Sequence, residues 1–353
     1  MAYTTIDDPS QYFQTATYTG NDSSNAITND GNSDLQPDWL WTKNSSSAAD
    51  HKIFDSTRGV TKFLESNTND AEGTQANLLS SFNSDGFTLG AGGETNSGST
   101  NYVAWQWKAN GGTTSTNSDG SENTVVQAST TSGFSIVTYS GPSGSGVDTR
   151  GHGLGAVPAV VLIKGRGGTE NWVMYHHRNT SAPETDVLKL NLDNATADES
   201  GNFNDTAPTS TVFTSGDTGA TNEDGNTYVA YCFAEKQGFS KFGKYKGNNN
   251  TDGTFVYTGF KPQLVIVKET GNTRNWGMAD SRLQTAGNGT VTNALFPNLT
   301  ASKDANERID IYSNGFKLKT TSTTWNSNNG NYIYLAWASS PFVSSKGVPT
   351  TAR

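Results

Sequence analysis

Apolar residues along this chain gather in runs of four to eight, and Gly, Asn, Asp and Pro separate these runs. Val157–Lys164 and Leu264–Lys268 are nearly continuous and indicate buried strands, whereas Asp186–Leu192 alternates between apolar and polar positions, as a half-exposed strand does. Helical periodicity is almost absent, and the nearest helical candidate is Ala71–Phe82. The pattern therefore predicts an all-β protein.

A hairpin is predicted near the C-terminus. Residues 309–312 and 316–319 are apolar-rich segments that flank Asn314-Gly315, a pair typical of tight β-turns. Residues 84–89 carry a similar turn and strand earlier in the chain.

Three landmarks recur in the same order three times, which indicates internal repetition. The first is an aromatic strand, at 12–20, 133–141 and 238–247. The second is an apolar run that begins near a proline, at Pro37, Pro158 and Pro262. The third is an aromatic-rich strand, at 102–107, 228–233 and 332–337. A spacing of more than a hundred residues is too long for a solenoid or a propeller blade and is that of a small domain.

We expect three homologous units in tandem, each of about six strands and resembling a β-sandwich, with jelly-roll or concanavalin-like character possible. Residues 1–111 form an N-terminal arm and unit 1, residues 112–235 a linker and unit 2, and residues 236–353 unit 3 and a C-terminal tail. The connector 110–123 has no apolar side chain and is predicted to be flexible or exposed. Units 2 and 3 are joined by residues 235–237 alone, which implies that they pack together. The sequence leaves open whether the three units share one core.

Composition excludes several functional classes. Hydrophobic residues make up 32% of the 353 residues and charged residues only 16%, yet there are 8 Trp, 13 Tyr and 16 Phe. A disordered chain would lack these aromatics. The net charge is −9 and no basic stripe exists, so nucleic-acid binding is not expected. No run approaches the length of a membrane span, and the N-terminus has no signal peptide.

The candidates for chemistry each have a plain structural interpretation. His176 and His177 are adjacent in a predicted strand, so their side chains point to opposite faces and do not readily share a metal; we expect a partly exposed polar strand end. His51 and His152 are isolated, and Cys232 lies in an apolar strand as a small buried side chain. No catalytic, cofactor-binding or metal-binding residue is assigned, and the binding residues are unknown.

Two loop motifs were weighed in the same way. Gly151, Gly153 and Gly155 form a GxGxG pattern, but a strand follows where a phosphate-binding loop needs a helix, so these glycines are expected to serve a turn with positive φ. Residues 221–228 resemble the Asp-box turn of sialidase-type propellers, which is structural, and the arginine cluster of an anionic-sugar hydrolase is missing. Clusters of Asp and Asn could bind Ca²⁺ through their side-chain oxygens, but they do not show the regular spacing of ligands that a calcium-binding loop has.

Most aromatic residues are expected in the core because they recur at matched places: Trp105, Trp107, Tyr228, Tyr231, Trp337 and Phe342. Trp39 and Trp41 have the same parity and should face one side. Trp172 and Trp276 each follow an Asn at equivalent positions, which favours architecture over a ligand platform. The positions of Trp39, His176 and Asp280 differ between units, so we expect no repeated chemistry.

Several motifs, spread over nearly the whole chain, resemble one class of proteins: SGFSIVTYSG (132–141), GHGLGAVPAVVLIK (151–164), NWVMYHH (171–177), NDTAPTSTVF (204–213), TYVAYCFAEKQGFSKFGKYKGN (227–248) and SNGFKL (313–318). The class is an uncharacterised group of marine bacteriophage virion proteins of the cyanophage type, often described as tail-fibre-like. Unit 1 departs from the pattern, with residues 25–29 in place of the HGLG turn.

The resemblance implies a non-enzymatic, β-rich structural protein on the exterior of a tailed phage particle, without cofactors. Such a protein would be localised to the virion, in the tail or a fibre, and would contact other virion proteins and a host glycan or protein. Alternatives are a capsid decoration protein and a glycan-binding or glycan-degrading receptor-binding protein. A homo-oligomer, with a trimer as the guess, would bury strand edges.

Overall fold

Antiparallel strands make up nearly all of the regular structure, which confirms the all-β prediction. The structure is a computed structural model and describes residues 2–142, 144, 146–284 and 289–350. The helices that it contains are single turns: η1 (Pro9–Gln11), α1 (Gly93–Asn96), α2 (Ser200–Phe203), η2 (Ser281–Leu283) and α3 (Thr323–Asn326). The last residues of the expected C-terminal tail, 351–353, lie outside the described residues.

Unit 1 contains a main sheet, a small second sheet and a short ribbon. The main sheet has the order β1-β9-β3-β4, the second sheet β2-β8-β7, and the ribbon is β5-β6. The strands are β1 (Phe13–Thr19), β2 (Asn25–Ile27), β3 (Trp39–Asn44), β4 (Lys52–Asp55), β5 (Lys62–Phe63), β6 (Gly73–Thr74), β7 (Leu79–Phe82), β8 (Phe87–Leu89) and β9 (Asn101–Trp107).

Unit 2 has a longer main sheet, of order β10-β11-β12-β19-β14-β15-β16-β17, and the pair β13-β18. The strands are β10 (Ser115–Asn117), β11 (Thr124–Ser129), β12 (Phe134–Ser140), β13 (Asp148–Gly151), β14 (Val160–Gly165), β15 (Val173–His176), β16 (Asp186–Lys189), β17 (Ala197–Asp198), β18 (Val212–Ser215) and β19 (Thr227–Phe233).

Unit 3 forms one continuous sheet of order β20-β27-β22-β23-β24-β25-β26-β21. The strands are β20 (Ser240–Lys246), β21 (Phe255–Tyr257), β22 (Phe260–Glu269), β23 (Gly277–Asp280), β24 (Thr290–Leu295), β25 (Asp304–Tyr312), β26 (Gly315–Leu318) and β27 (Asn331–Pro341). The predicted hairpin is confirmed, because β25 and β26 pair antiparallel across Asn314.

The same four strands stand side by side in every unit. The first aromatic strand of each unit pairs with the aromatic-rich strand that ends the unit. That strand also pairs with the strand after the proline, whose other neighbour is the strand that follows it in sequence. The orders are β1-β9-β3-β4, β12-β19-β14-β15 and β20-β27-β22-β23. The three landmarks recognised in the sequence are therefore neighbouring strands of one sheet.

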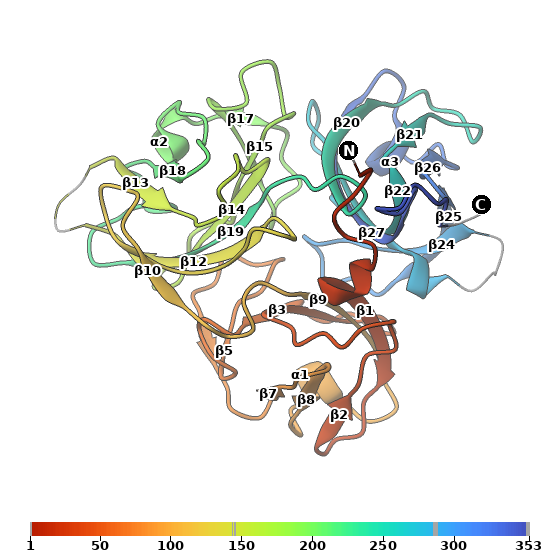
Figure 1. Ribbon diagram of the computed structural model, residues 1–353, viewed down its shortest axis with the longest axis horizontal. Helices are drawn as coiled ribbons and strands as arrows, with labels where there is room; N and C mark the ends of the chain where they lie inside the picture. Colours follow the sequence, from red (N-terminus) through yellow and green to blue (C-terminus); the bar gives the residue numbers. More distant parts are fainter. Residues whose placement is uncertain (1, 143, 145, 285–288, 351–353) are drawn as a thin grey trace.

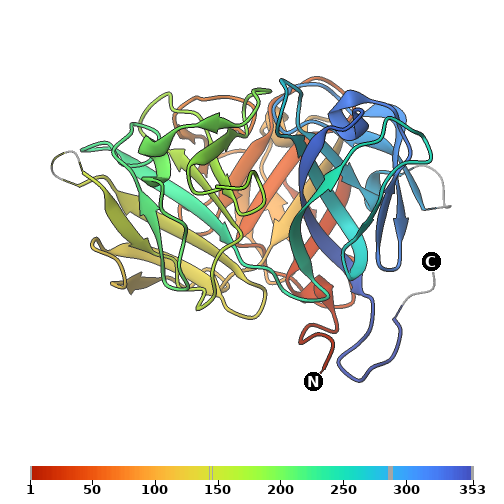
Figure 2. The same cartoon turned by 90° about the horizontal axis from the view of Figure 1, so that it is seen from above.

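The three units are arranged around a common centre. In Figure 1, unit 1 forms the lower lobe, unit 2 the upper left lobe and unit 3 the upper right lobe. In the perpendicular view of Figure 2, the N-terminal segment and the C-terminal segment lie on the same side of the molecule. The N-terminal arm is held by unit 3, where the Tyr3 hydroxyl donates to the carbonyl of Gly259 at 2.7 Å.

The central strands are buried on both faces, which explains their continuous apolar sequences. All residues of β3 and β14 are buried. In β3, Leu40 packs into the core of unit 1, while Trp39 and Trp41 point to the centre of the molecule, as their shared parity predicted. The central cluster contains residues of all three units, so the units share a core.

Residues 71–82 contain β6 and β7, in agreement with the near absence of helical periodicity, and the connector 110–123 is largely exposed, as predicted, although it also contains strand β10. Two other local expectations are wrong. The expected half-exposed strand at 186–192 ends at Lys189, because a turn follows. Phe342 is only partly buried, unlike the other five matched aromatics.

Candidate functional site: the junctions between the three units

Side chains from the three sheets form layers in the shared core. The first layer joins all the units: the ring centroids of Trp107 and Trp337 are 5.2 Å apart, those of Trp337 and Phe233 5.4 Å, and those of Phe233 and Trp39 5.8 Å. Edge-to-face and tilted ring contacts of this kind add to the large area that aromatic side chains bury. Trp107 and Trp337, which the sequence placed in the core, therefore help to hold the three units together, along with Trp39 and Phe233.

Four residues from this layer along the same sheets, a lysine stands where a continuing core would be apolar. Lys43, Lys164 and Lys268 occupy equivalent positions of β3, β14 and β22, opposite Val103, Val229 and Ile333. Each lysine is nearly fully buried. Burial lowers the pKa of each of the three ammonium groups to about 8.

Each of these lysines links its own unit to the next one. Lys43 Nζ donates to the carbonyls of Asn44 and Thr300, at 2.8 and 3.0 Å. Lys164 and Lys268 likewise donate to the carbonyl of the following residue, and then to Asn69 of unit 1 and Asp193 of unit 2, at 3.2 and 3.3 Å. The contacts run around the molecule in one direction, from unit 1 to 3, 3 to 2 and 2 to 1.

A second repeated junction lies at the end of β4, β15 and β23, where Asp55, His176 and Asp280 are equivalent. Asp280 reaches unit 1, where its Oδ2 accepts from Trp105 Nε1 at 2.8 Å and from Thr15 Oγ1 at 2.7 Å. Asp55 accepts from the Tyr231 hydroxyl of unit 2 at 2.7 Å. His176 reaches unit 3, where its Nε2 lies 3.3 Å from the carbonyl of Tyr334.

Whether the junction position holds an Asp or a His depends on the residue that faces it from the neighbouring unit. Trp105 and Tyr231 bring a side-chain donor, and each faces a carboxylate. The equivalent residue of unit 3 is Leu335, which offers no donor, and there His176 contacts a backbone carbonyl instead. The residue type therefore changes from unit to unit, as the sequence indicated, while the role of this position in joining two units is kept.

A third contact uses the residue that immediately precedes the same strand, before β4, β15 and β23. Trp172 Nε1 donates to Glu65 O at 2.8 Å and Trp276 Nε1 to Lys189 O at 3.1 Å, each in another unit. In unit 1 the equivalent residue is His51, whose Nε2 lies 3.0 Å from Phe296 O. The architectural interpretation of the two Asn-Trp pairs is confirmed, and His51 takes the place of the third indole.

The Asp-box-like segment is a repeated structural turn. The hydroxyl of Tyr228 accepts from the amide of Glu223 at 2.7 Å and donates to Gly219 O at 2.8 Å. Tyr102 and Tyr332 do the same in the other two units. Each of the three tyrosines also stacks on a tyrosine of the first aromatic strand: Tyr18, Tyr139 and Tyr245.

All four histidines serve structural contacts. Burial lowers the pKa of every histidine, that of His176 to about 3. His152 Nε2 lies 3.2 Å from Thr209 O, and His177 Nε2 lies 2.6 Å from Phe242 O. His176 is fully buried, so the expectation of a partly exposed strand end holds for His177 alone.

The remaining motifs also have structural roles. Gly153 and Gly155 have φ of 69° and 63°, which confirms their predicted turn conformation, whereas Gly151 is the last residue of strand β13 and does not have positive φ. Cys232 is buried, and burial raises the pKa of its thiol. In the part of the chain that the structure describes, no group of three or more His, Cys, Asp or Glu side chains is placed to hold a metal ion.

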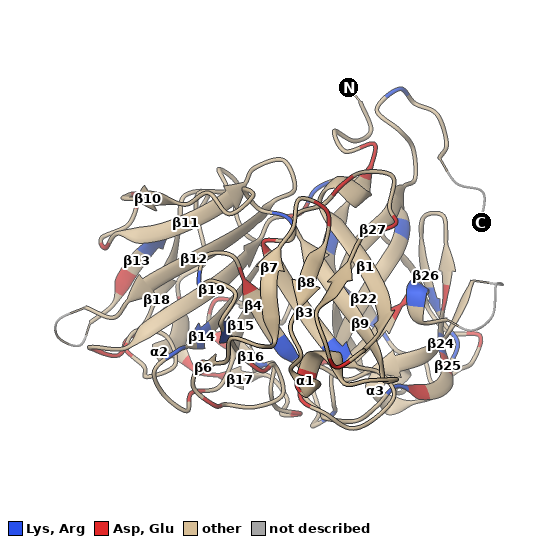
Figure 3. Cartoon of the chain, turned by 90° about the horizontal axis from the view of Figure 1, so that it is seen from below, with Lys and Arg blue, Asp and Glu red and all other residues tan. Residues whose placement is uncertain are grey.

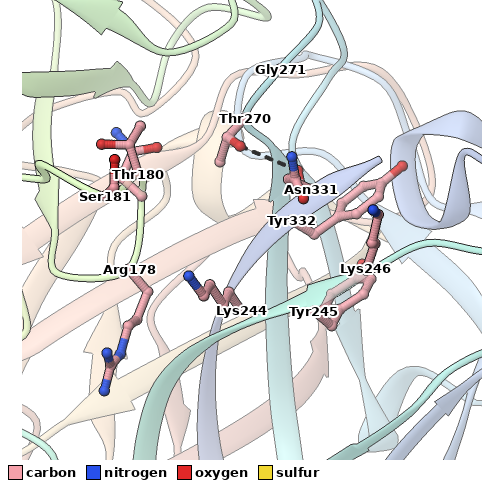
Figure 4. Close-up of a pocket in the computed structure, with 11 residues that line it drawn as sticks. Arg178, Thr180, Ser181, Lys244, Tyr245, Lys246, Thr270, Gly271, Asn331 and Tyr332 are labelled. Atoms are coloured by element: carbon pink, nitrogen blue, oxygen red, sulfur yellow. Dashed lines mark hydrogen bonds between the residues drawn. The ribbon is translucent and has the colours of Figure 1, made fainter. Parts of the chain in front are cut away.

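A groove lies between units 2 and 3. It encloses about 540 Å³ and is lined by residues 178–181 of unit 2, by parts of β20 and β27, and by Thr270 and Gly271, which follow β22. Figure 4 shows Lys244 extending across the groove towards the 178–181 segment, and a hydrogen bond between Thr270 and Asn331 on the far side. A second groove, of about 280 Å³, lies at the equivalent junction between units 1 and 3.

Charged side chains are dispersed over the molecule. The view in Figure 3 shows Lys and Arg interspersed with Asp and Glu rather than collected on one face. Among the residues described, no helix is long and apolar enough to cross a membrane.

Sequence reasoning missed the lysines and the cross-unit contacts. The signal for the lysines was present, because Lys43, Lys164 and Lys268 each end the apolar run that follows the proline. The partner atoms are mostly backbone carbonyls of distant loops, which carry no sequence signal. The comparison with curated proteins found no match, and neither did the comparison with solved structures.

A family model, described as a domain of unknown function (DUF7483), matches residues 8–341. The match includes all three units, from β1 to β27. The chain therefore belongs to this family.

Proposed function

We propose that the chain is a non-enzymatic structural protein on the exterior of a tailed bacteriophage virion, associated with the tail or a fibre. The proposal rests on the motifs that resemble marine phage virion proteins and on the use that the chain makes of its buried polar groups. The observation that carries the structural role is the set of repeated junctions, because Lys268, Asp280, Trp276 and their equivalents all bond from one unit to another.

A scaffold role fits this distribution of polar groups. Catalytic sites place perturbed titratable groups together in a cleft. In this chain, the three junction lysines and the four histidines, all with lowered pKa values, are buried or half-buried and contact backbone carbonyls. Their hydrogen bonds stabilise a rigid body whose loops are free to contact neighbouring subunits or a host surface.

The threefold arrangement of units also affects how many copies of the chain would form one body on the virion. Tail fibres are commonly built as closed trimers, and the resemblance to phage proteins predicts a trimer of this chain. One chain here already places three related units around a centre (Figure 1). We propose that a single copy serves as the three-lobed body, and that further copies join through the loops.

Electron microscopy of particles decorated with an antibody against this protein tests the proposal. Label on the tail or fibre is the expected result. Label on the capsid would favour a decoration protein instead, and particles that carry no label would contradict the virion role. Release of soluble sugar from host envelopes by the purified protein would contradict the non-enzymatic assignment.

A further inference from the structure

The first aromatic strand has a different environment in unit 2 from that in unit 3. In unit 2, β11 pairs with the outer edge of β12, with Val125 opposite Thr138. In unit 3, β20 ends its sheet, and no described strand pairs with its outer edge. The groove between units 2 and 3 lies along this edge, at Lys244, Tyr245 and Lys246.

The hydrogen bonds of β20 show which backbone groups face the groove. Phe239 O and the amide of Gly247 bond toward the β27 side, so the even-numbered residues between them face outward. Phe242 confirms this alternation, because its amide donates to Glu235 Oε1 at 2.8 Å and its carbonyl is contacted by His177. Lys244 is the next outward-facing residue. It is the equivalent of Thr138, which pairs with Val125 in unit 2.

The charges of the groove select the kind of strand that fits. Arg178, Lys244 and Lys246 are exposed, and none of them has an ion pair among the residues that the structure describes. Asn179, which also lines the groove, is only 6% exposed, yet its Nδ2 has no hydrogen-bond partner there. The groove therefore offers three free cations and a buried amide donor, in a chain whose net charge is −9.

We propose that this groove binds an acidic peptide segment of a partner protein in extended conformation, which adds as a short antiparallel strand to β20 at Lys244. Strand addition to an open sheet edge supplies backbone hydrogen bonds, and side-chain charges then give selectivity. A second copy pairing through its own β20 is disfavoured, because lysines would face lysines. This inference goes beyond the proposed function, since it does not depend on where the protein is mounted.

The chain itself supplies the probe. A synthetic peptide of residues 119–129 contains the β11 strand together with Asp119 and Glu122. Its fluorescently labelled form is titrated with the full-length protein, and binding is followed by anisotropy. We expect saturable binding that weakens with added salt, and weaker binding of a peptide in which both acidic residues are replaced by lysine.

Two N-methylated peptides test whether the backbone pairs as a strand. N-methylation at Val125 removes the amide that faces β12 in unit 2, whereas N-methylation at Val126 blocks the opposite side of the strand. We expect the first change to abolish binding and the second to preserve it. Equal effects of the two changes would overturn strand addition.

Variants of the protein test the location. The double variant K244E/K246E should weaken binding about tenfold, since two exposed ion pairs become repulsive contacts. Lys261→Glu, on β22 outside the groove, is the matched control and should leave binding unchanged. No binding of the acidic peptide to the wild type would overturn the proposal. Stronger binding of dextran sulfate than of the peptide would also overturn it, in favour of an acidic polysaccharide.

Discussion

The carboxylate of Asp280 shows how much one residue contributes to a junction. It is fully buried and accepts hydrogen bonds from Trp105, Thr15, Gln263 and the amide of Arg282. A carboxylate in this position satisfies four donors, and those of Trp105, Thr15 and Gln263 would otherwise be buried without a partner.

Asp280→Ala should therefore lower the free energy of unfolding by about 2–4 kcal/mol, because several buried donors lose their acceptor. Chemical denaturation followed by tryptophan fluorescence measures the change. Asp252→Ala is the control, since Asp252 pairs with Lys317 on the surface and its loss should leave stability unchanged.

A double-mutant cycle with Trp105→Phe isolates the bond between the units. Because the phenyl ring has no donor, part of the effect of Asp280→Ala should disappear in the Trp105→Phe background. Strict additivity of the two effects would contradict a direct contribution of this hydrogen bond.

The buried lysines predict a dependence of stability on pH. Lys268 has a pKa of about 8 in the fold and an ordinary value of 10.5. Between these two values the unfolded chain binds more protons than the folded one, so this lysine makes the protein more stable as the pH rises.

The free energy of unfolding of the wild type, minus that of the Lys268→Met variant, should therefore increase from pH 8 towards pH 10. Lys164→Met should show the same trend, since Lys164 has the same environment and the same lowered pKa. A difference that stays constant over this range would show that the lysines keep their charge throughout.

Strands β12 and β20 are equivalent, but they differ in whether a neighbouring strand bonds to their outward-facing amides. The outward amide of Thr138 in unit 2 faces β11, whereas the outward amide of Lys244 in unit 3 faces the groove. Tyr245, the next residue of β20, faces β27 and serves as an internal reference.

Hydrogen exchange should separate these amides. We expect the amide of Lys244 to exchange orders of magnitude faster than those of Thr138 and Tyr245, because only the latter two are bonded within a sheet. NMR or mass-spectrometric exchange measures the rates. Equal protection of Lys244 and Thr138 would contradict the open edge that the further inference requires.

The sequence predicted elements better than it predicted their associations. The runs around Val160 and Leu264 form central strands, and the predicted hairpin is present, because local patterns determine both; its turn is Ser313-Asn314, with Gly315 already paired in β26. The pairing of β10 with β11 was not predicted, because residues 110–123 carry no apolar side chains. This connector is held to β11 by hydrogen bonds instead, such as the one from the amide of Gly112 to Gln127 Oε1 at 3.0 Å.

At the scale of the whole molecule, the shared core is the feature that sequence could not decide. Repeats indicate three units, but they do not show whether Trp39, Trp107 and Trp337 meet at one centre or face three separate cores. Contacts between residues hundreds of positions apart leave no local signal. The one local sign is that a lysine, buried in the structure, ends the apolar run after the proline in each unit, where the apolar core stops.

Differential scanning calorimetry tests the shared core most directly. If the three units fold around one centre, the protein should unfold in a single transition, with equal calorimetric and van't Hoff enthalpies. Trp41→Ala in unit 1 should move that whole transition to lower temperature, as a loss of about 3–5 kcal/mol implies. Two or three separate transitions, with only one of them shifted by Trp41→Ala, would contradict the account.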